Sequence, residues 1–283
     1  MTAAVEVSGL TKRHGDHTVV DDVSFDVRSG TVTCLAGPNG AGKSSTLRLV
    51  AGLDRPSDGK VLVHGQPLQS WPEPGRRLGA AFDGRAAHPG RTALDSLRWV
   101  ARLVGVPEDR CAQLLQEVGL ASVARRRTRT FSLGMHRRLA LAIALLPEPE
   151  VLVLDEPLNG LDPEGVVWFR SLLQDLRSRG RTVLMVSHAM ADVGDLVDDV
   201  VTMREGRIEE SGTAARLWRR HDTVHVRTDD PQRLAAVLQT AGGRIVRVDE
   251  DFAMHVGGLD TGAITRLATA HGLTLTGAHG SDS

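Results

Sequence analysis

The sequence predicts an α/β fold whose core is a parallel sheet, followed by a small C-terminal ferredoxin-like α+β domain. Two observations carry this prediction. Short apolar segments alternate with helical patterns over about residues 31–186, which is typical of a parallel sheet covered by helices. From about residue 223 the order becomes strand, helix, two strands, helix and strand, which is the split βαβ arrangement. We therefore expect two domains, at residues 1–220 and 223–283.

The first elements of the chain surround a glycine-rich segment. Residues 5–28 alternate apolar and polar side chains around a turn at Gly15 and Asp16, which predicts antiparallel strands. Residues 31–36 form a short apolar run, typical of a buried strand, and residues 45–51 have helical spacing. A strand therefore leads directly into the glycine-rich segment, and a helix leads out of it.

The middle of the first domain is predicted to be a helical insertion, at about residues 84–130. A strand at residues 60–64 precedes a stretch rich in proline and glycine, at residues 66–90. Beyond the insertion, helices alternate with fully buried strands, as expected for a parallel sheet. The helices are expected at residues 92–104, 110–118, 132–146 and 166–178, and the strands at residues 151–154 and 182–186.

The C-terminal domain has a predictable fold but no ligand motif. A regulatory or dimer-supporting appendage and a merely stabilising cap remain equal alternatives for it. Residues 279–283 look like a frayed tail. The strands are expected at residues 224–227, 244–248, 252–256 and 273–276, and the helices at residues 231–241 and 261–271.

The composition is that of a folded globular protein and gives no electrostatic reason to expect a nucleic-acid partner. Hydrophobic residues make up 41%, charged residues 24%, and the formal net charge is -1. No secretory signal is visible, and the longest apolar run, residues 139–146, is far shorter than the roughly 20 residues that span a bilayer. Action on a membrane would therefore need a partner. Cys34 and Cys111 are expected to be small core residues.

The glycine-rich segment fits the phosphate-binding pattern G-x-x-x-x-G-K-S. Its small residues allow successive backbone N–H groups to turn inward around phosphates at the start of a helix. The lysine can then reach the β- and γ-phosphates of a nucleotide, and the first serine can bind Mg²⁺. The expected nucleotide-binding residues are Gly37, Pro38, Asn39, Gly40, Ala41, Gly42, Lys43, Ser44 and Ser45, with Ser44 also a metal ligand.

Two carboxylates, Asp155 and Glu156, follow the buried strand at residues 151–154. Open parallel sheets bind ligands at this edge, where ionised acids need a cation or hydrogen-bond donors. We expect Asp155 to hold Mg²⁺, directly or through water, and Glu156 to orient the water that attacks the γ-phosphate or to accept its proton. The alternative is an acidic helix cap after a strand. The two motifs together leave a kinase, a GTPase, a helicase and a transporter ATPase open.

The segment Phe-Ser-Leu-Gly-Met at residues 131–135 decides among these classes. It resembles the signature sequence Leu-Ser-Gly-Gly-Gln of ABC-transporter ATPases and lies, as in that family, just upstream of the two carboxylates. Residues 159–162 resemble the family's D-loop, and Ser187 and His188 after a buried strand resemble its switch histidine. The resemblance to ABC-transporter ATPases covers about residues 5–220.

The resemblance implies a P-loop NTPase fold with a RecA-like parallel core, an antiparallel β subdomain and the helical insertion. It implies ATP and Mg²⁺ as cofactors, hydrolysis of ATP, and contact of His188 with the γ-phosphate. It also implies that Ser132, Gly134 and Asp162 meet the nucleotide held by a second copy of the chain, in a nucleotide-sandwich dimer. Physically, Ser132 and Gly134 lie at a helix N-terminus, which attracts anions, and Ser132 also serves as an ordinary helix cap. The other implied partner is a transmembrane permease, received by the helical insertion at the cytoplasmic face of the membrane.

The sequence departs from the family pattern at several positions. His14 stands where a tyrosine usually stacks on adenine, so ATP is the expected nucleotide with GTP left open. Asp83 stands where the family's Q-loop has a glutamine, and some exporter ATPases of the bacitracin type also have an acidic residue there. This resemblance implies that Asp83 binds Mg²⁺. The alternative is that Asp83 is an ordinary turn residue before Gly84. Leu133 and Met135 replace the glycine and the glutamine of the signature, as the same subgroup tolerates. Before the signature, the arginines at positions 125–127 and 129 are expected to form a solvated face, with contact to nucleotide or permease as the alternative.

The leading hypothesis is an ATPase subunit that drives a separate permease, as an exporter of a drug, lipid or peptide. A soluble ABC ATPase acting on nucleic acid or ribosomes is the alternative from another class. A single nucleotide-binding unit, without a coiled-coil insertion or a basic stripe, argues against it. A degenerate module that binds nucleotide without turnover is the third possibility.

Overall fold

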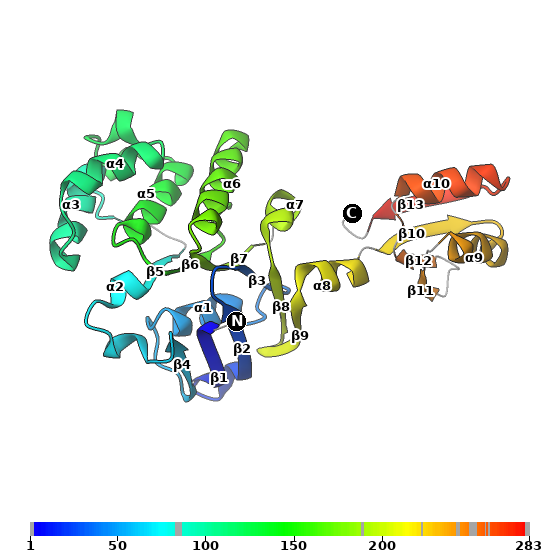
Figure 1. Cartoon of the computed structure of the whole chain (residues 1–283), viewed down its shortest axis with the longest axis horizontal. Coiled ribbons are helices and arrows are strands. Elements are labelled where there is room, and N and C mark those ends of the chain that lie inside the picture. The colour runs from blue at the N-terminus through cyan, green and yellow to red at the C-terminus, as the bar shows by residue number, and fades with distance from the viewer. Residues whose placement is uncertain are drawn as a thin grey trace. The chain divides into compact units, whose positions relative to one another are not determined.

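The computed structural model of the chain forms two compact units, Met1–Gly212 and Thr213–Ser283 (Figure 1). The boundary places residues 213–221 with the second unit, whereas the sequence predicts them in or beside the first domain. The structure describes residues 3–82, 87–187, 190–221, 223–241, 244–248, 254–257, 259 and 261–280.

The first unit contains a six-stranded sheet in the order β5-β6-β7-β3-β8-β9. Neighbours from β5 through β8 pair in parallel, with Val32 opposite Val183 and Val151 opposite Thr182. Strands β3, β6 and β7 are buried over nearly their whole length, which explains their continuous apolar sequences. The strands are β3 (Val32–Ala36), β5 (Leu78–Ala81), β6 (Val151–Asp155), β7 (Thr182–Val186), β8 (Asp199–Arg204) and β9 (Arg207–Thr213).

A second, antiparallel sheet of the first unit has the order β2-β1-β4, with β1 at Ala3–His14, β2 at His17–Arg28 and β4 at Asp58–Val63. Strands β1 and β2 form a hairpin with His14 opposite His17. Buried side chains of both sheets, including Val5, Val20 and Leu35, belong to one hydrophobic core with helix α1. This core holds the end of β3, where the glycine-rich segment begins.

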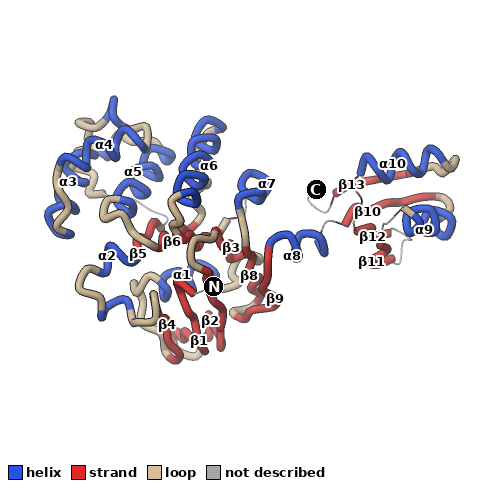
Figure 2. Tube along the Cα trace, in the orientation of Figure 1, coloured by secondary structure: helices blue, strands red, loops and turns tan. Residues whose placement is uncertain are grey.

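Helices α3, α4 and α5 form the predicted insertion and its continuation, and lie together in Figure 2. The Thr92 side chain accepts a hydrogen bond from the Asp95 amide at the start of α3, and Gly105 ends that helix with a φ of 69°. The helices of the unit are α1 (Lys43–Val50), α2 (Pro74–Arg77), α3 (Ala93–Val104), α4 (Asp109–Glu117), α5 (Leu133–Leu145), α6 (Pro163–Ser178) and α7 (Met190–Val193), with short 3₁₀ turns at Leu68–Ser70, Ala121–Val123, Thr128–Thr130 and Gly194–Leu196.

The second unit contains the four-stranded antiparallel sheet β11-β12-β10-β13. This order and the βαββαβ connectivity are those of the ferredoxin-like arrangement that the sequence predicts. Val224, Val226, Leu234 and Ile264 belong to its separate hydrophobic core. The elements are α8 (Ala214–His221), β10 (Thr223–Thr228), α9 (Pro231–Thr240), β11 (Arg244–Val248), β12 (Met254–Gly257), α10 (Thr261–Ala270) and β13 (Leu275–Gly280).

Two sequence-based expectations need correction. The proline- and glycine-rich stretch contains a strand, β5, because its short Leu-Gly-Ala-Ala segment pairs with β6. His279 and Gly280 are not a frayed tail, because their backbone pairs with His225 and Val224 of β10. Within the part of the chain that the structure describes, none of the helices combines the length and apolar character needed to cross a bilayer.

Candidate functional site

The glycine-rich loop lies between β3 and α1 and requires glycine at two positions. Gly37 has a φ of 142° and Gly42 a φ of 94°, both in the region that favours glycine. A Cβ atom at Gly37 would lie 2.1 Å from the Met203 carbonyl oxygen, and one at Gly42 would lie 2.5 Å from the Val19 carbonyl oxygen. Backbone conformation and close packing therefore both exclude larger residues.

The turn between β8 and β9 holds this loop in place. The Gly206 amide donates to the Ala41 carbonyl at 3.1 Å, and the Gly206 carbonyl accepts from the Asp21 amide at 2.8 Å. One glycine thus links the loop to strand β2. A backbone hydrogen bond at Ala41 therefore ties the loop to this turn.

Lys43, the first residue of α1, is only 6% exposed. Its Nζ donates to the carbonyl oxygens of Gly37 at 2.8 Å and Pro38 at 2.9 Å. Burial lowers the pKa of the ammonium group, and the negative charges of Glu156 and Asp155 oppose this shift. The lysine is a buried cation at a helix N-terminus, where an incoming phosphate would compete with loop carbonyls for its protons.

The carboxylate pair approaches this lysine from the end of β6. Asp155 is 8% exposed, and its Oδ1 accepts a hydrogen bond from the Ser44 hydroxyl at 3.0 Å. Glu156 has a φ of 48°, which is strained for a residue with a side chain. Its amide donates to Val186 at 3.0 Å and its carbonyl accepts from Asn159 at 3.1 Å. Backbone bonds to the next strand and the following turn therefore hold Glu156 in this conformation.

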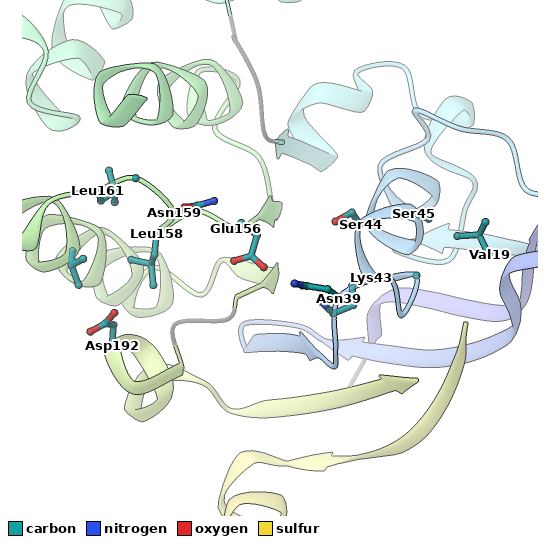
Figure 3. A pocket seen from close by; sticks show the side chains of 14 residues that line it. Val19, Asn39, Lys43, Ser44, Ser45, Glu156, Leu158, Asn159, Leu161 and Asp192 are labelled. Atoms are coloured by element: carbon teal, nitrogen blue, oxygen red, sulfur yellow. The ribbon is translucent and has the colours of Figure 1, made fainter. Parts of the chain in front are cut away.

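Lys43, Ser44 and Glu156 line a cavity of about 710 Å³, large enough for a nucleotide (Figure 3). Figure 3 shows Asn39, Lys43 and Ser44 on one side, Glu156 near the centre and Asp192 on the opposite side. The loop and α1 supply amides, an ammonium group and hydroxyls, which suit phosphates. The lining residues are Val19, Asn39, Gly40, Gly42, Lys43, Ser44, Ser45, Glu156, Leu158, Asn159, Gly160, Leu161, Val166 and Asp192.

The predicted signature segment lies outside this cavity, at the start of α5. The Ser132 hydroxyl caps the helix by accepting from the Met135 amide at 3.2 Å. Leu133 is 54% exposed, and a Cβ atom at Gly160 would lie 2.4 Å from Leu133 Cδ2. Leu133 therefore covers the outer side of a glycine that lines the cavity. Asp162 caps α6 by accepting from the Gly165 amide at 2.9 Å.

The structure brings together most, but not all, of the residues that the sequence singled out. The described residues that line the cavity include Val19 but not His14, which is exposed in the β1–β2 hairpin. Asp83 and His188 lie outside the described residues, so their predicted roles stay predictions.

Asn159, Gly160 and Leu161 of the predicted D-loop line the cavity, although only Asp162 of that loop was an expected site residue. Four further lining residues were not predicted: Val19, Leu158, Val166 and Asp192. The first three are ordinary apolar residues whose sequence neighbourhood carries no signal. Asp192 follows the predicted switch histidine by four residues in the sequence, and no motif singled it out.

Comparison with known proteins gives two family matches. Residues 20–159 match the family described as ABC transporter. Residues 222–277, in the second unit, match a domain of unknown function, DUF8746.

Individual relatives are named as ATP-binding proteins of transport systems. The chain is 34% identical to the lantibiotic transport ATP-binding protein SrtF of Streptococcus pyogenes over 205 residues, which cover 72% of this chain and 88% of SrtF. It is 39% identical to the Fe(3+) ions import ATP-binding protein FbpC of Streptomyces coelicolor, over 76% of this chain and 64% of FbpC. A solved ATP-binding subunit of an ABC transporter is similar with 28% identity and a TM-score of 0.70, over 77% of this chain and 92% of that one.

Proposed function

This chain belongs to the ATP-binding proteins of ABC transporters, a family of ATPases, and we propose that it energises a separately encoded membrane permease. This proposal depends on one observation: Lys43, Ser44 and Glu156 line the same cavity, and the Ser44 hydroxyl donates a hydrogen bond to Asp155. A site with only the glycine loop could bind a nucleotide. The carboxylate beside it adds the means to activate water.

The loop residues would bind the phosphates of ATP. Backbone amides at the start of α1 and the Lys43 ammonium group supply positive charge where phosphate oxygens would lie. Glu156 would orient the attacking water or accept its proton, because its carboxylate shares the cavity with Lys43. His188 at the γ-phosphate and His14 at the base remain part of the proposal by family resemblance.

Ser44 and Asp155 fit a bound Mg²⁺. Their oxygens lie 3.0 Å apart, and Mg²⁺ in nucleotide sites takes few protein oxygens together with phosphates and water. The described residues contain no cluster of three or more His, Cys, Asp or Glu that could hold a metal by itself, so such a site depends on the nucleotide. The ion would neutralise phosphate charge. Asp83 is proposed as a further ligand.

We propose that the site is completed by a second copy of the chain. Ser132 and Gly134 stand at the N-terminus of a helix but do not line the cavity of their own chain. An exposed helix N-terminus suits an anion, and the resemblance assigns that anion to the nucleotide of the other copy. Asp162 of the D-loop would lie at the same contact between the two copies.

We favour export of a drug, peptide or lipid, because Asp83 and the altered signature resemble exporter ATPases. Relatives named for lantibiotic transport and for iron import both match, so relatedness alone does not choose. The expected location is the cytoplasmic face of the membrane, beside the permease.

The test is a Glu156→Gln variant assayed for ATP hydrolysis together with the permease that the wild-type chain energises. We expect turnover to fall by about 100-fold or more while ATP binding is retained, since general-base catalysis contributes this much. Glu205→Gln is a matched control, because Glu205 is exposed and has the same φ of 48°. Hydrolysis by Glu156→Gln at the wild-type rate would show that the assignment of Glu156 is wrong.

A further inference from the structure

Three histidines occupy one row of the antiparallel sheet in the second unit. His225 of β10 lies opposite His255 of β12, and on its other side it lies opposite His279 of β13. The strand order β11-β12-β10-β13 makes His225 the middle position of the row (Figure 1). Residues far apart in the sequence therefore come to neighbouring positions on three adjacent strands. These three residues are called here the histidine row.

The histidine row lies on the face of the sheet turned away from α9 and α10. Successive residues of a strand belong to alternate faces. Val224 and Val226 flank His225 in the sequence and are buried in the core of the unit. Leu234 of α9 and Ile264 of α10 belong to the same core. His225 is therefore on the opposite face, and the other two histidines share that face because they are in register with it.

The positions beside the row offer space and no competing acid. On the same face, two residues from each outer histidine, β12 has Gly257 and β13 has Gly277. The charged residues at neighbouring positions are Arg227 of β10 and Arg247 of β11, the latter opposite His255. Among the described positions next to the row, none carries an acid. Imidazole nitrogen is therefore the ligand chemistry that the row itself supplies.

The histidines of the second unit are concentrated in this row. The unit contains five histidines, and the two outside the row are His221 and His271. The structure describes the three histidines of the row through their backbone pairing. They are therefore outside the set of described side chains, in which no metal-binding cluster occurs.

The spacing of the row suits one metal ion. Residues directly opposite each other in antiparallel strands have Cβ atoms about 4.5–5.5 Å apart. The two outer histidines are therefore about 10 Å apart at Cβ, with the middle one halfway between them. An imidazole ring extends well beyond its Cβ, and its bond to Zn²⁺ adds about 2.0–2.1 Å. Three rings based at such positions are able to converge on one ion.

We propose that the histidine row binds one divalent transition-metal ion that prefers nitrogen ligands, with Zn²⁺ as the expected species. At neutral pH an ordinary imidazole is mostly uncharged, and the neutral ring is the form that binds metals. An anion would instead need protonated rings. Mg²⁺ prefers oxygen ligands and belongs to the nucleotide site. Three histidines leave one position of a tetrahedral ion for water or another ligand.

The ion would link three strands that are distant in sequence. Strand β13 lies at the edge of the sheet and carries the last histidine of the row. A metal held by β12, β10 and β13 binds the folded unit and not the unfolded chain, so it stabilises the fold. Zn²⁺ should therefore raise the temperature at which the second unit unfolds. This site is independent of the proposed function and goes beyond it.

The experiment titrates Zn²⁺ into the untagged full chain at neutral pH, without nucleotide, and measures binding by calorimetry. We expect one ion per chain. His225→Ala removes the middle ligand and should weaken binding by at least about 100-fold, because the loss of a partner that only orients a ligand already costs about 10–100-fold. His255→Ala and His279→Ala each leave a neighbouring pair and should weaken binding less. His271→Ala is the matched control, because His271 is an exposed histidine of the same unit outside the row.

Circular dichroism shows whether each variant folds, and X-ray absorption of the Zn²⁺-loaded wild type gives a measurement that needs no variant. We expect three imidazole nitrogens around the ion. A site of oxygen or sulfur ligands would overturn the proposal. So would wild type that binds no Zn²⁺, or a folded His225→Ala chain that binds Zn²⁺ as tightly as His271→Ala. ATP binding should stay unchanged in all of these variants, so the nucleotide site is tested separately.

Discussion

Helices α1 and α5 both begin with glycine- and serine-containing segments, but the two N-termini are built differently. At α1, the N-cap is Gly42, no side chain caps the helix, and the preceding loop is enclosed by β2 and the β8–β9 turn. At α5, the Ser132 hydroxyl caps the helix and the next residue, Leu133, is half exposed. One N-terminus lines a cavity, and the other lies on the surface.

The difference fits the proposal that each nucleotide site is shared by two copies of the chain. The enclosed α1 end can hold phosphates alone, because lysine and amides surround them on several sides. The exposed α5 end has no such surroundings, and in the proposed function it meets a phosphate only when a second copy of the chain presents one. Each prediction below tests one side of this contrast.

The largest expected effect concerns the burial of the strand that leads to α1. Burial raises the pKa of the Cys34 thiol from 9.0 to about 12, so at neutral or mildly alkaline pH the thiol stays protonated. Three pKa units correspond to about 1000-fold less reactive thiolate than in an exposed cysteine. Alkylation of Cys34 at pH 8, followed by mass spectrometry, should be slower by at least this factor in the native than in the unfolded chain. Equal alkylation rates in the native and the unfolded chain would mean that the strand leading to α1 does not bury Cys34.

The next effect concerns Lys43. Its removal deletes a charged donor to phosphate, so Lys43→Ala should weaken ATP binding by roughly 100-fold, since hydrogen bonds to charged groups contribute about 1.5–3 kcal/mol each. Lys60→Ala is the matched control, because Lys60 is exposed on β4 and carries the same charge. Titration with a fluorescent ATP analogue measures the nucleotide affinity of both variants. Unchanged affinity in Lys43→Ala would contradict the phosphate role of the loop.

A smaller effect is expected at the α5 end. Ser132→Ala removes the cap and should cost about 1 kcal/mol of unfolding free energy. Thr92→Ala removes the cap of α3 in the same insertion and should cost about as much. ATP-driven dimerisation separates the two variants: Ser132→Ala should weaken it by about 10-fold, as for one lost hydrogen bond, and Thr92→Ala should not. Urea unfolding measures the stability of the two variants, and sedimentation measures their dimerisation. Equal dimerisation of Ser132→Ala and Thr92→Ala would mean that Ser132 acts only as a helix cap.

The contrast between the two ends also explains what the sequence could predict. The glycine loop, the carboxylates after β6 and the Ser132 cap are local features, because neighbours in sequence create each of them. The structure brings Ser44 to Asp155 and joins the loop to Glu156 in one cavity, as expected for groups at the same edge of a parallel sheet. The strand order of the second unit followed from its pattern of elements.

Features that depend on tertiary contacts were not predictable. Val19 lies on β2, and only the packing of its strand against Gly42 places it in the cavity. Strands β8 and β9 were not assigned, yet the turn between them holds the loop through Gly206. A hollow lined by Trp99 of α3 and Ile143 of α5 exists only because these two helices meet, and neither residue was singled out from the sequence.

The central claim is that the nucleotide site is completed by the α5 end of a second copy. Sedimentation of the Glu156→Gln variant with and without ATP tests it most directly, because this variant should bind ATP and turn it over only slowly. We predict a monomer without ATP and a dimer with ATP. Adding Ser132→Arg, which fills the anion surface of α5 and leaves the cavity of its own chain intact, should give a monomer that still binds ATP. A Glu156→Gln chain that stays monomeric at saturating ATP, or a Ser132→Arg chain that still dimerises, would contradict the claim.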